Sequence, residues 1–469
     1  MKFSPTLAAL ALCAAPALAA QPDVARLEAE LARLSQRLAQ LEAAPPRALP
    51  AEAEQAAQRD ALRARLEDIE IELLTLRRQS RAIETVEGLS AAAGLTLVAQ
   101  RVATGATAGA DAQFNYRADV SVTLPAGAVG AGVGHLFAHF RLGQGEGVAP
   151  SSPGFSSTPN STSFELSAGD DAAAVLAQAW YQLDVPLAGA HAAPPRHLEF
   201  NFGKLDPFVF FDQNAVADDE TTRFLNNAFV HNPLLDSGGA AGVDAYGFAP
   251  GMRLAYHADR AEGEWWRASV AAFGADDGAS FDTSFSRPFL IAQLEAARRF
   301  GDLPGNYRLY AWTNGRATPY ANPADPGSER QSGWGLSVDQ QLAPALTLFA
   351  RYGGATGGRA RFDRAVTAGA EIAGTAWGRE NDRLGFAAGW LRASRAFEAA
   401  APVLDADGLD GPDFGYAPNG AERLAELYYA WHVNDRLALT PDLQWIARPG
   451  ADGTAEDVTV VGLRATMGF

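Results

Sequence analysis

Apolar and polar side chains alternate with a period of two along most of this chain. In the last stretch, residues 457–469 (DVTVVGLRATMGF), every second residue from Phe469 back to Val461 is apolar, and the residues between them are small or polar. This period is that of a β-strand, so the segment predicts a strand with one apolar and one polar face. The pattern recurs back to about Gly94. Apolar outward faces and polar inward faces are typical of a membrane-spanning barrel with water inside.

The most regular strand is predicted for residues 114–124 (FNYRADVSVTL), in which apolar and polar residues alternate without a break. Residues 175–185 alternate less strictly, and residues 198–202 form a shorter alternating run. At about 10 residues per strand plus connections, the region from Gly88 onward accommodates about 14 to 18 strands, and we expect 16. The predicted fold class is all-β: a transmembrane antiparallel β-barrel preceded by a short α-helical coiled coil.

Two kinds of connection separate the predicted strands. Short turns join the strands of two hairpins, at residues 342–345 and 434–436. Long polar inserts separate other strands, at residues 143–163, 319–331 and 399–420. Short turns at one end and long loops at the other are typical of outer-membrane barrels, so the connections agree with the strands.

Composition narrows the classes of protein further. The 469 residues are 48% hydrophobic, yet the mean hydropathy is only -0.10, because the apolar residues are dispersed. Beyond the N-terminus, no apolar stretch approaches the roughly 20 residues that a membrane-spanning helix needs. The net charge of -17 argues against a nucleic-acid-binding protein, which would present a basic face.

Residues 1–20 predict a secretory signal peptide. Lys2 supplies the positive end, residues 7–12 begin the apolar core, and residues 17–19 (ALA) offer a cleavage site with small residues. The only cysteine, Cys13, lies within this segment, so we expect a mature chain without disulfides or thiolate metal sites. Export through such a signal fits a protein of the outer membrane of a Gram-negative-type cell.

Residues 21–87 carry two short heptad seams, from Leu27 to Leu41 and from Leu62 to Leu76, with apolar residues spaced 4, 3, 4, 3. Prolines between the seams interrupt any helix. Each seam is short for an isolated helix, so we favour a parallel coiled coil in the periplasm, stabilised by a trimeric barrel. An amphipathic helix folded back on the barrel is the alternative. The predicted domains are therefore 1–20, 21–87 and a barrel of residues 88–469.

Residues 202–236 break the alternation and concentrate aromatic and acidic side chains. A loop folded into the lumen needs aromatic residues against the wall and polar groups facing water, and aromatic faces with carboxylates also suit sugar rings. We expect Asp212 and Asp218 to supply negative charge, and Phe210 or Phe211 a surface for a sugar. An external loop packed on itself is the alternative. The candidate pore-constriction or substrate-binding residues in this segment are Asp206, Phe210, Phe211, Asp212, Asn214, Asp218 and Arg223.

Arginines at predicted inward positions could face these carboxylates across the lumen. Such a ladder would create a transverse field at a constriction. The alternative is that each arginine pairs with a neighbouring Asp or Glu of the wall. The arginines included among the candidate constriction residues are Arg117, Arg141 and Arg253, and the other inward candidates are Arg267, Arg308 and Arg351.

No residue pattern supports an enzyme, a cofactor or a metal site. The chain has no HExxH helix, no phosphate-binding glycine loop and no GxSxG elbow. His135 and His139 would lie about 13 Å apart on one strand, too far to share a metal ion. The acidic run of Asp218, Asp219 and Glu220 lacks the spacing of a calcium loop.

The barrel region resembles the carbohydrate-selective porins, the OprB-like group. Residues 426–449 (ELYYAWHVNDRLALTPDLQWIARP) are similar to the near-terminal hairpin of that family, and the aromatic terminus at Phe469 also matches. The resemblance implies a 16-stranded barrel, often trimeric, that admits sugars or other small solutes by diffusion. In the central segment the matching residues are Gly203, Lys204, Phe211, Asp212, Gln213, Asn214, Arg223, Phe224 and Leu225.

The predicted function is passive diffusion of small hydrophilic solutes, above all carbohydrates, through a water-filled barrel with a constriction. Binding at that constriction must be weak enough to let the solute leave. The predicted partners are these solutes, outer-membrane lipid, two further copies in a homotrimer, and the cell wall through residues 21–87. The alternatives are a structural protein that tethers the outer membrane to the cell wall, and a general ion-permeable porin.

Overall fold

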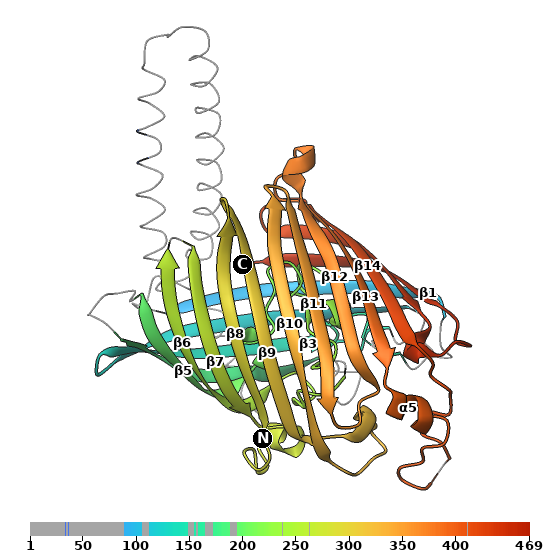
Figure 1. Cartoon of the computed structure of the whole chain (residues 1–469). Helices are drawn as coiled ribbons and strands as arrows, with labels where there is room; N and C mark the ends of the chain where they lie inside the picture. Colours follow the sequence, from blue (N-terminus) through green and yellow to red (C-terminus); the bar gives the residue numbers. More distant parts are fainter. Residues whose placement is uncertain are drawn as a thin grey trace.

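The structure, a computed structural model, forms one closed antiparallel barrel of 16 strands (Figure 1), so the predicted fold and strand number are confirmed. The predicted signal peptide and coiled coil, apart from Arg33 and Gln36, lie outside the residues that the structure describes. Besides those two, the described residues are 89–105, 112–148, 154–155, 158–164, 172–187, 195–236, 238–261, 263–409 and 411–469.

Each strand pairs with its neighbours in the chain, and β1 closes the barrel by pairing with β16, which leaves no free sheet edge. The strands are β1 (Ser90–Thr104), β2 (Ala112–Val129), β3 (Gly132–Gln144), β4 (Ala173–Pro186), β5 (Arg196–Leu205), β6 (Ala249–Ala261), β7 (Glu264–Phe273), β8 (Phe289–Phe300), β9 (Leu303–Ala317), β10 (Glu329–Ala343), β11 (Leu346–Gly357), β12 (Phe362–Ala373), β13 (Arg383–Ala393), β14 (Ala421–His432), β15 (Leu437–Ala447) and β16 (Val458–Gly468).

The connections between strands contain only short helices among the described residues. None of these helices is long and apolar enough to cross a membrane. They are α4 (Asn227–Val230), α5 (Arg395–Ala400) and the 3₁₀ helices η1 (Pro207–Val209), η2 (Asp276–Ser280), η3 (Pro319–Ala321), η4 (Gly374–Trp377) and η5 (Pro449–Ala451).

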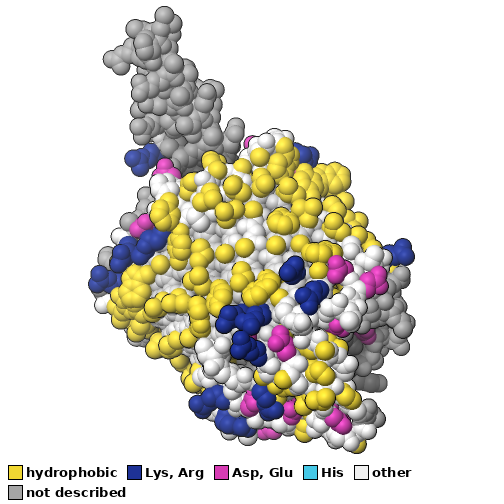
Figure 2. Space-filling model, turned by 45° about the vertical axis from the view of Figure 1, so that its right-hand side comes forward, with side chains coloured by type: hydrophobic (Ala, Val, Ile, Leu, Met, Phe, Trp, Pro, Cys, Tyr) yellow, Lys and Arg dark blue, Asp and Glu magenta, His cyan; other side chains and the backbone are white. Residues whose placement is uncertain are grey.

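Side chains alternate between the outer surface and the lumen, as the sequence predicts. In β2, Phe114 is 56% exposed on the outer surface, whereas Asn115 and Arg117 are buried inside the barrel. In β16, Leu463 is exposed and Arg464 is fully buried. Figure 2 shows hydrophobic side chains spread as a broad band over one face of the barrel, with charged side chains gathered mainly below it. An apolar band on the outer wall is what contact with lipid requires.

The connections at the two ends of the barrel differ in length. Residues 301–302 and 344–345 are tight turns, whereas residues 145–172 and 394–420 are long connections at the other end. In Figure 1, α5 marks the long-loop end at the bottom of the view. Both predicted hairpins are present, as β10 with β11 and β14 with β15. Because the number of strands is even, the chain enters β1 and leaves β16 at the tight-turn end.

The longest connection, residues 206–248 between β5 and β6, folds into the barrel, and we call it the inner loop. Our predicted boundaries for it, 202–236, were wrong at both ends. The first four of those residues continue β5, because Phe202 still faces outward and Leu205 is still buried. Beyond residue 236 the chain stays out of the sheet until β6 begins at Ala249.

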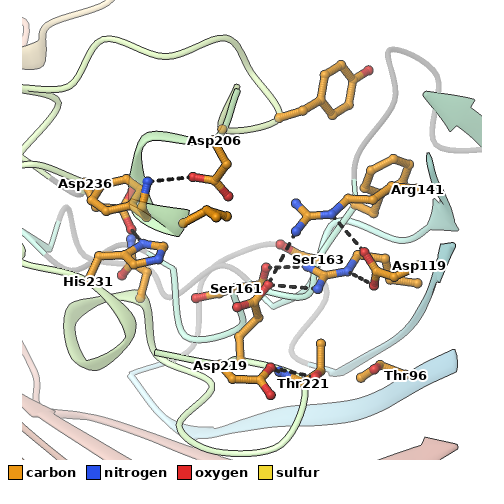
Figure 3. Close-up of a pocket in the computed structure, with 18 of the residues that line it drawn as sticks. Thr96, Asp119, Arg141, Ser161, Ser163, Asp206, Asp219, Thr221, His231 and Asp236 are labelled. Carbon is orange, nitrogen blue, oxygen red and sulfur yellow. Dashed lines mark hydrogen bonds and ion pairs between the residues drawn. The ribbon is translucent and has the colours of Figure 1, made fainter. Parts of the chain in front are cut away.

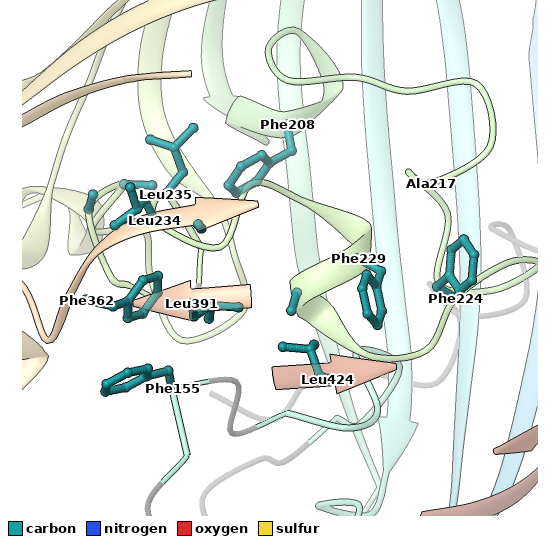
Figure 4. Close-up of a cluster of buried hydrophobic side chains, with 14 of the residues drawn as sticks. Phe155, Phe208, Ala217, Phe224, Phe229, Leu234, Leu235, Phe362, Leu391 and Leu424 are labelled. Carbon is teal, nitrogen blue, oxygen red and sulfur yellow. The ribbon is translucent and has the colours of Figure 1, made fainter. Parts of the chain in front are cut away.

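Buried aromatic and aliphatic side chains attach the inner loop to one side of the barrel wall (Figure 4). Phe224 packs on Phe229 within the loop, and on Phe349 of β11 and Tyr428 of β14, with ring centroids 5.0–5.7 Å apart. Phe229 is fully buried. The loop therefore fills the lumen beside β11–β14, and the residues that the structure describes leave the side of β1–β4 open.

Arginine at Val120, in the middle of the outward face of β2, should destabilise the barrel by about 2–4 kcal/mol, because that side chain would face lipid near the membrane midplane. Arginine at the next residue, Ser121, should cost much less because it points into the lumen. Urea titration of both variants folded into vesicles measures the two free energies of unfolding. Equal costs would contradict the assigned faces.

Candidate functional site

A fully buried ion pair fastens the inner loop to the wall. Arg351 of β11 holds Asp212 through its Nε, 3.1 Å from Asp212 Oδ1, and donates from Nη2 to the Asp212 carbonyl oxygen at 3.0 Å. The Tyr310 hydroxyl donates to the same carboxylate at 2.6 Å, and the Asn232 backbone N–H donates to its other oxygen. Asp212 has a φ of 59°, a left-handed conformation that Asp tolerates better than most residues.

The close approach of loop and wall requires a glycine on β11. A Cβ atom at Gly353 would lie 2.4 Å from Oδ1 of Asn232, which is too close for any real contact. Asn232 in turn donates from its side chain to the Tyr310 hydroxyl at 2.7 Å. Glycine therefore lets the loop lie directly against the strand backbone.

Further hydrogen bonds attach the loop to strands around the same side of the barrel. The Asn214 side chain donates to the Ser337 hydroxyl of β10 at 3.2 Å. Glu426 of β14 accepts hydrogen bonds from two backbone N–H groups of the loop, those of Leu225 and Asn226. Burying a carboxylate is costly unless donors surround it, and here the loop backbone supplies them.

On the opposite side of the loop lies a cavity of about 1020 Å³ (Figure 3). Strands β1–β4 and β16 form its wall, and the inner loop and parts of residues 158–164 form the other sides. Most of the residues around it are polar or charged. This cavity is the candidate functional site.

A basic cluster on β2 and β3 forms one side of the cavity. The Asp119 carboxylate accepts hydrogen bonds from Arg117 Nε at 2.8 Å and from Arg141 Nε at 3.0 Å. Its Oδ1 also lies 2.8 Å from His139 Nε2. Glu220 of the inner loop approaches from the other direction, 2.8 Å from Arg117 Nη2 and 3.8 Å from Arg141 Nη2. Two guanidinium groups thus share two carboxylates at the edge of the open space.

Acidic residues of the inner loop face this cluster across the cavity (Figure 3). His231 Nδ1 lies 3.1 Å from Asp236 Oδ2, and the Phe208 ring stacks on the His231 ring with centroids 3.8 Å apart. Burial opposes the charged form of His231, but the hydrogen bond to Asp236 and the nearby carboxylates outweigh it and raise its pKa to about 9. Burial also raises the pKa of Asp206.

Burial raises the pKa of Asp218 to about 8, although Arg351, 3.9 Å away, favours the charged form. At neutral pH this carboxyl is therefore mostly protonated and contributes little charge. Asp212 is fully buried, and Arg351 compensates its charge. The negative charge expected from these two aspartates is thus neutralised in one by an ion pair and in the other by protonation.

The cavity should therefore become more cation-selective as the pH rises from 7 to 10. Asp218 gains its negative charge around pH 8, and His231 loses its positive charge around pH 9, so both changes have the same sign. Reversal potentials across a KCl gradient measure this selectivity. Asp218→Asn should remove the step near pH 8, and a step that persists in this variant would contradict its assignment.

The structure places only some of the predicted site residues on the cavity. Arg117, Arg141, Asp206 and Asp218 line it. Phe211 and Asp212 are buried in the contact between loop and wall, and Phe210 lies under the guanidinium of Arg253, whose Cζ is 4.9 Å from the ring centroid. Neither phenylalanine offers the open aromatic face that we expected. Predicted residues that lie in the loop–wall contact or on the adjacent wall are Phe210, Phe211, Asp212, Asn214, Arg223 and Arg253.

The six inward arginines divide between the two alternatives that the sequence left open. Wall carboxylates alone hold three of them, since Arg253 pairs with Glu199, Arg267 with Glu295, and Arg308 with Glu295 and Asp339. The other three pair with the inner loop, and two of these, Arg117 and Arg141, also pair with Asp119 of the wall. In that group Arg117 and Arg141 approach Glu220, and Arg351 holds Asp212.

Sequence reasoning missed several residues of the cavity. His139 belongs to it because β3 directs that side chain inward toward Asp119. Tyr246 lies beyond the predicted end of the loop, and its ring is partly exposed beside Phe164, at a centroid distance of 5.6 Å. His139 could have been predicted from its inward position in the alternation of β3, whereas no sequence signal marks Tyr246.

A family profile and one solved structure agree with this fold. The family profile described as carbohydrate-selective porin, OprB family, matches residues 159–469. A structure of OprB from Pseudomonas putida at high pH has a TM-score of 0.59 and 19% identity, covers 81% of this chain and 94% of that chain, and shows a shared fold. Mutants of the Rh. blastica porin reach a TM-score of 0.43 and 10% identity over 81% of this chain and 100% of theirs. The comparison with curated proteins finds no match.

The family and the fold are those of channels that catalyse no reaction. The profile match extends over more than half of the chain and includes the inner loop and the strands to which it is attached. With its closed barrel of 16 strands, the chain therefore belongs to the OprB family of carbohydrate-selective porins and is an outer-membrane porin for sugars.

Proposed function

We propose that sugars cross the lumen through the cavity between the inner loop and strands β1–β4, and that its charged side chains form the constriction. The observation that carries this proposal is the placement of opposed charges around the side of the loop that the described residues leave open, with Arg141 and Asp119 facing Asp206 and Asp236. The volume of about 1020 Å³ is at the upper end of the roughly 300–1,000 Å³ of pockets for small ligands.

The chemistry of the lining suits a polyhydroxylated solute. Carboxylates accept hydrogen bonds from sugar hydroxyls, and guanidinium groups donate to them. Tyr246 adds a partly exposed aromatic face against which the C–H face of a sugar ring can pack. Because most of these groups already have partners in the protein, binding is weak, as passage through a channel requires.

The predicted residues take two roles in this proposal. Arg117, Arg141, Asp206 and Asp218 act on the solute directly, because they line the cavity. The remaining predicted residues act by holding the inner loop in place. Those supporting residues are Phe210, Phe211, Asp212, Asn214, Arg223 and Arg253.

We further propose that the porin is a homotrimer in contact with outer-membrane lipid, and that residues 21–87 form a periplasmic coiled coil that contacts the cell wall. The exposed apolar side chains of the outer wall support the lipid contact. The start of β1 at the tight-turn end supports the periplasmic position, since short turns face the periplasm in outer-membrane barrels. The two heptad seams support the coiled coil and, through it, the trimer.

Removing the aromatic face of the cavity should weaken the block of ion current by sugars. Tyr246→Ala should raise the half-blocking sugar concentration about two- to tenfold, the equivalent of about 0.5–1.5 kcal/mol for one aromatic contact. Single-channel conductance with a series of mono- and oligosaccharides measures the block. Phe285→Ala, in the exposed connection between β7 and β8, is the matched control. An unchanged block in Tyr246→Ala would place the sugar elsewhere.

A further inference from the structure

Two histidines and a glutamate meet on the lumenal wall toward the tight-turn end, outside the cavity described above. His197 and Glu199 lie two positions apart on β5, and His257 is the register partner of His197 on the adjacent β6 (Figure 1). One ring nitrogen of each histidine and one carboxylate oxygen of Glu199 all lie within 4.8 Å of one another. We propose that these three side chains bind a divalent transition-metal ion of the zinc class.

The chemistry of the three side chains fits such an ion. Two imidazoles and one carboxylate form a common zinc ligand set, which leaves a fourth position open, here toward the lumen. Ligand atoms about 2.0–2.2 Å from zinc at tetrahedral angles lie about 3.3–3.6 Å apart, so side-chain rotation must bring the ligand atoms closer together. His197 Nε2 and Glu199 Oε1, 3.4 Å apart, are already within this range.

The His257 ring stacks on the His197 ring with centroids 4.8 Å apart, and its two nitrogens differ in their surroundings. Its Nε2 lies 3.0 Å from Asp259 Oδ1. Its Nδ1 is buried and has no hydrogen-bond partner among the described residues. A carboxylate bound to one ring nitrogen fixes the tautomer and leaves the lone pair of the other nitrogen available to a metal.

The surrounding charges permit a cation at this position. Arg253 Nη1 holds Glu199 Oε2 at 2.8 Å, which leaves Oε1 on the side of His197. Arg267 is 3.8 Å from Glu199 but is paired with Glu295 at 2.8 Å. Asp259 beside His257, and Asp184, the register partner of Glu199 on β4, add negative charge without an arginine partner within 4 Å among the described residues.

Zinc titration of the full-length porin tests the site. The protein is purified in detergent without a histidine tag, and isothermal calorimetry with zinc chloride should show one saturable site per chain. His197→Ala and His257→Ala should each weaken binding more than about tenfold, and Asp259→Asn should weaken it by about 10- to 100-fold. Glu199→Gln, which keeps the shape of the side chain, should also weaken binding if the alanine variants fold poorly.

His135→Ala is the matched control, because His135 also lies toward the tight-turn end and approaches a carboxylate, that of Asp184, at 3.7 Å, yet is outside the group. This variant should bind zinc as the wild type does. Bound zinc should also shift the reversal potential toward anions, because it adds positive charge to the lumen, and a chelator should reverse the shift. The absence of saturable binding in the wild type, undiminished binding in His257→Ala, or equal loss in His135→Ala would each overturn the assignment.

Discussion

Replacing Arg351 with methionine should release the inner loop from the wall and raise the single-channel conductance. The guanidinium donates three hydrogen bonds to the loop: to Asp212 Oδ1, to the Asp212 carbonyl oxygen, and to the Phe229 carbonyl oxygen at 2.8 Å. Without it, Asp212 would be a buried and unpaired carboxylate. Breaking a buried ion pair in this way costs about 3–5 kcal/mol, which is enough to detach a loop from its wall.

Three further variants separate the effect of the ion pair from general damage to the barrel. Tyr310→Phe removes one hydrogen bond to the same carboxylate and should cost about 1.5–3 kcal/mol, so its effect on conductance should be smaller. Arg351→Met combined with Asp212→Asn should recover part of the loss, because no unpaired charge remains, and Asn also tolerates the left-handed conformation. Arg364→Met, an exposed arginine of β12, should change nothing. An unaltered conductance in folded Arg351→Met would mean that this pair does not hold the loop.

Neutralising Asp119 should shift the porin toward anions. Arg117, Arg141 and His139 share this carboxylate, so Asp119→Asn leaves two guanidinium groups with Glu220 alone. An ion passing about 4 Å from the lost charge would change its energy by about 1 kcal/mol in water, or about fivefold in preference. No other carboxylate of the cavity has as many Arg and His partners among the described residues.

The salt dependence of this effect distinguishes a charge on the pathway from a structural disturbance. The screening length falls from about 30 Å at 0.01 M salt to about 3 Å at 1 M, so the shift in reversal potential should be largest in dilute KCl. Asp277→Asn, in the exposed connection between β7 and β8, makes the same charge change away from the cavity and should have little effect. Equal shifts in the two variants, or none in Asp119→Asn, would remove Asp119 from the pathway.

The sequence predicts the wall of this protein well because each strand separates two different environments. Val461 and Leu463 face outward and Arg464 inward, and the alternation of β16 alone is enough to assign these faces. The number of strands follows from the length of the alternating region divided by the length of one strand. The first residue of the inner loop cannot be predicted from the alternation, because Phe202 to Leu205 still alternate as a strand does.

The candidate site depends on contacts between residues far apart in the chain. Arg351 and Asp212 are 139 positions apart, and only the packing of the loop against β11 brings them together. His197 and His257 become neighbours through the register of β5 with β6, which sequence alternation does not specify. Residue type and inward position can therefore be predicted, whereas partners across the lumen cannot.

The central claim is that solutes pass between the inner loop and strands β1–β4, and modification of single cysteines tests it most directly. The only native cysteine is Cys13, within the expected signal peptide, so an introduced thiol can be labelled alone. Asp236→Cys and Ser163→Cys place a thiol on two different sides of the cavity (Figure 3), and Ser328→Cys, in the exposed connection between β9 and β10, is the control. Single-channel current is recorded while a charged methanethiosulfonate reagent is added. We predict a stepwise fall in current for the two cavity variants and none for the control; a current that stays constant in both cavity variants, after mass spectrometry has verified their labelling, would contradict this pathway.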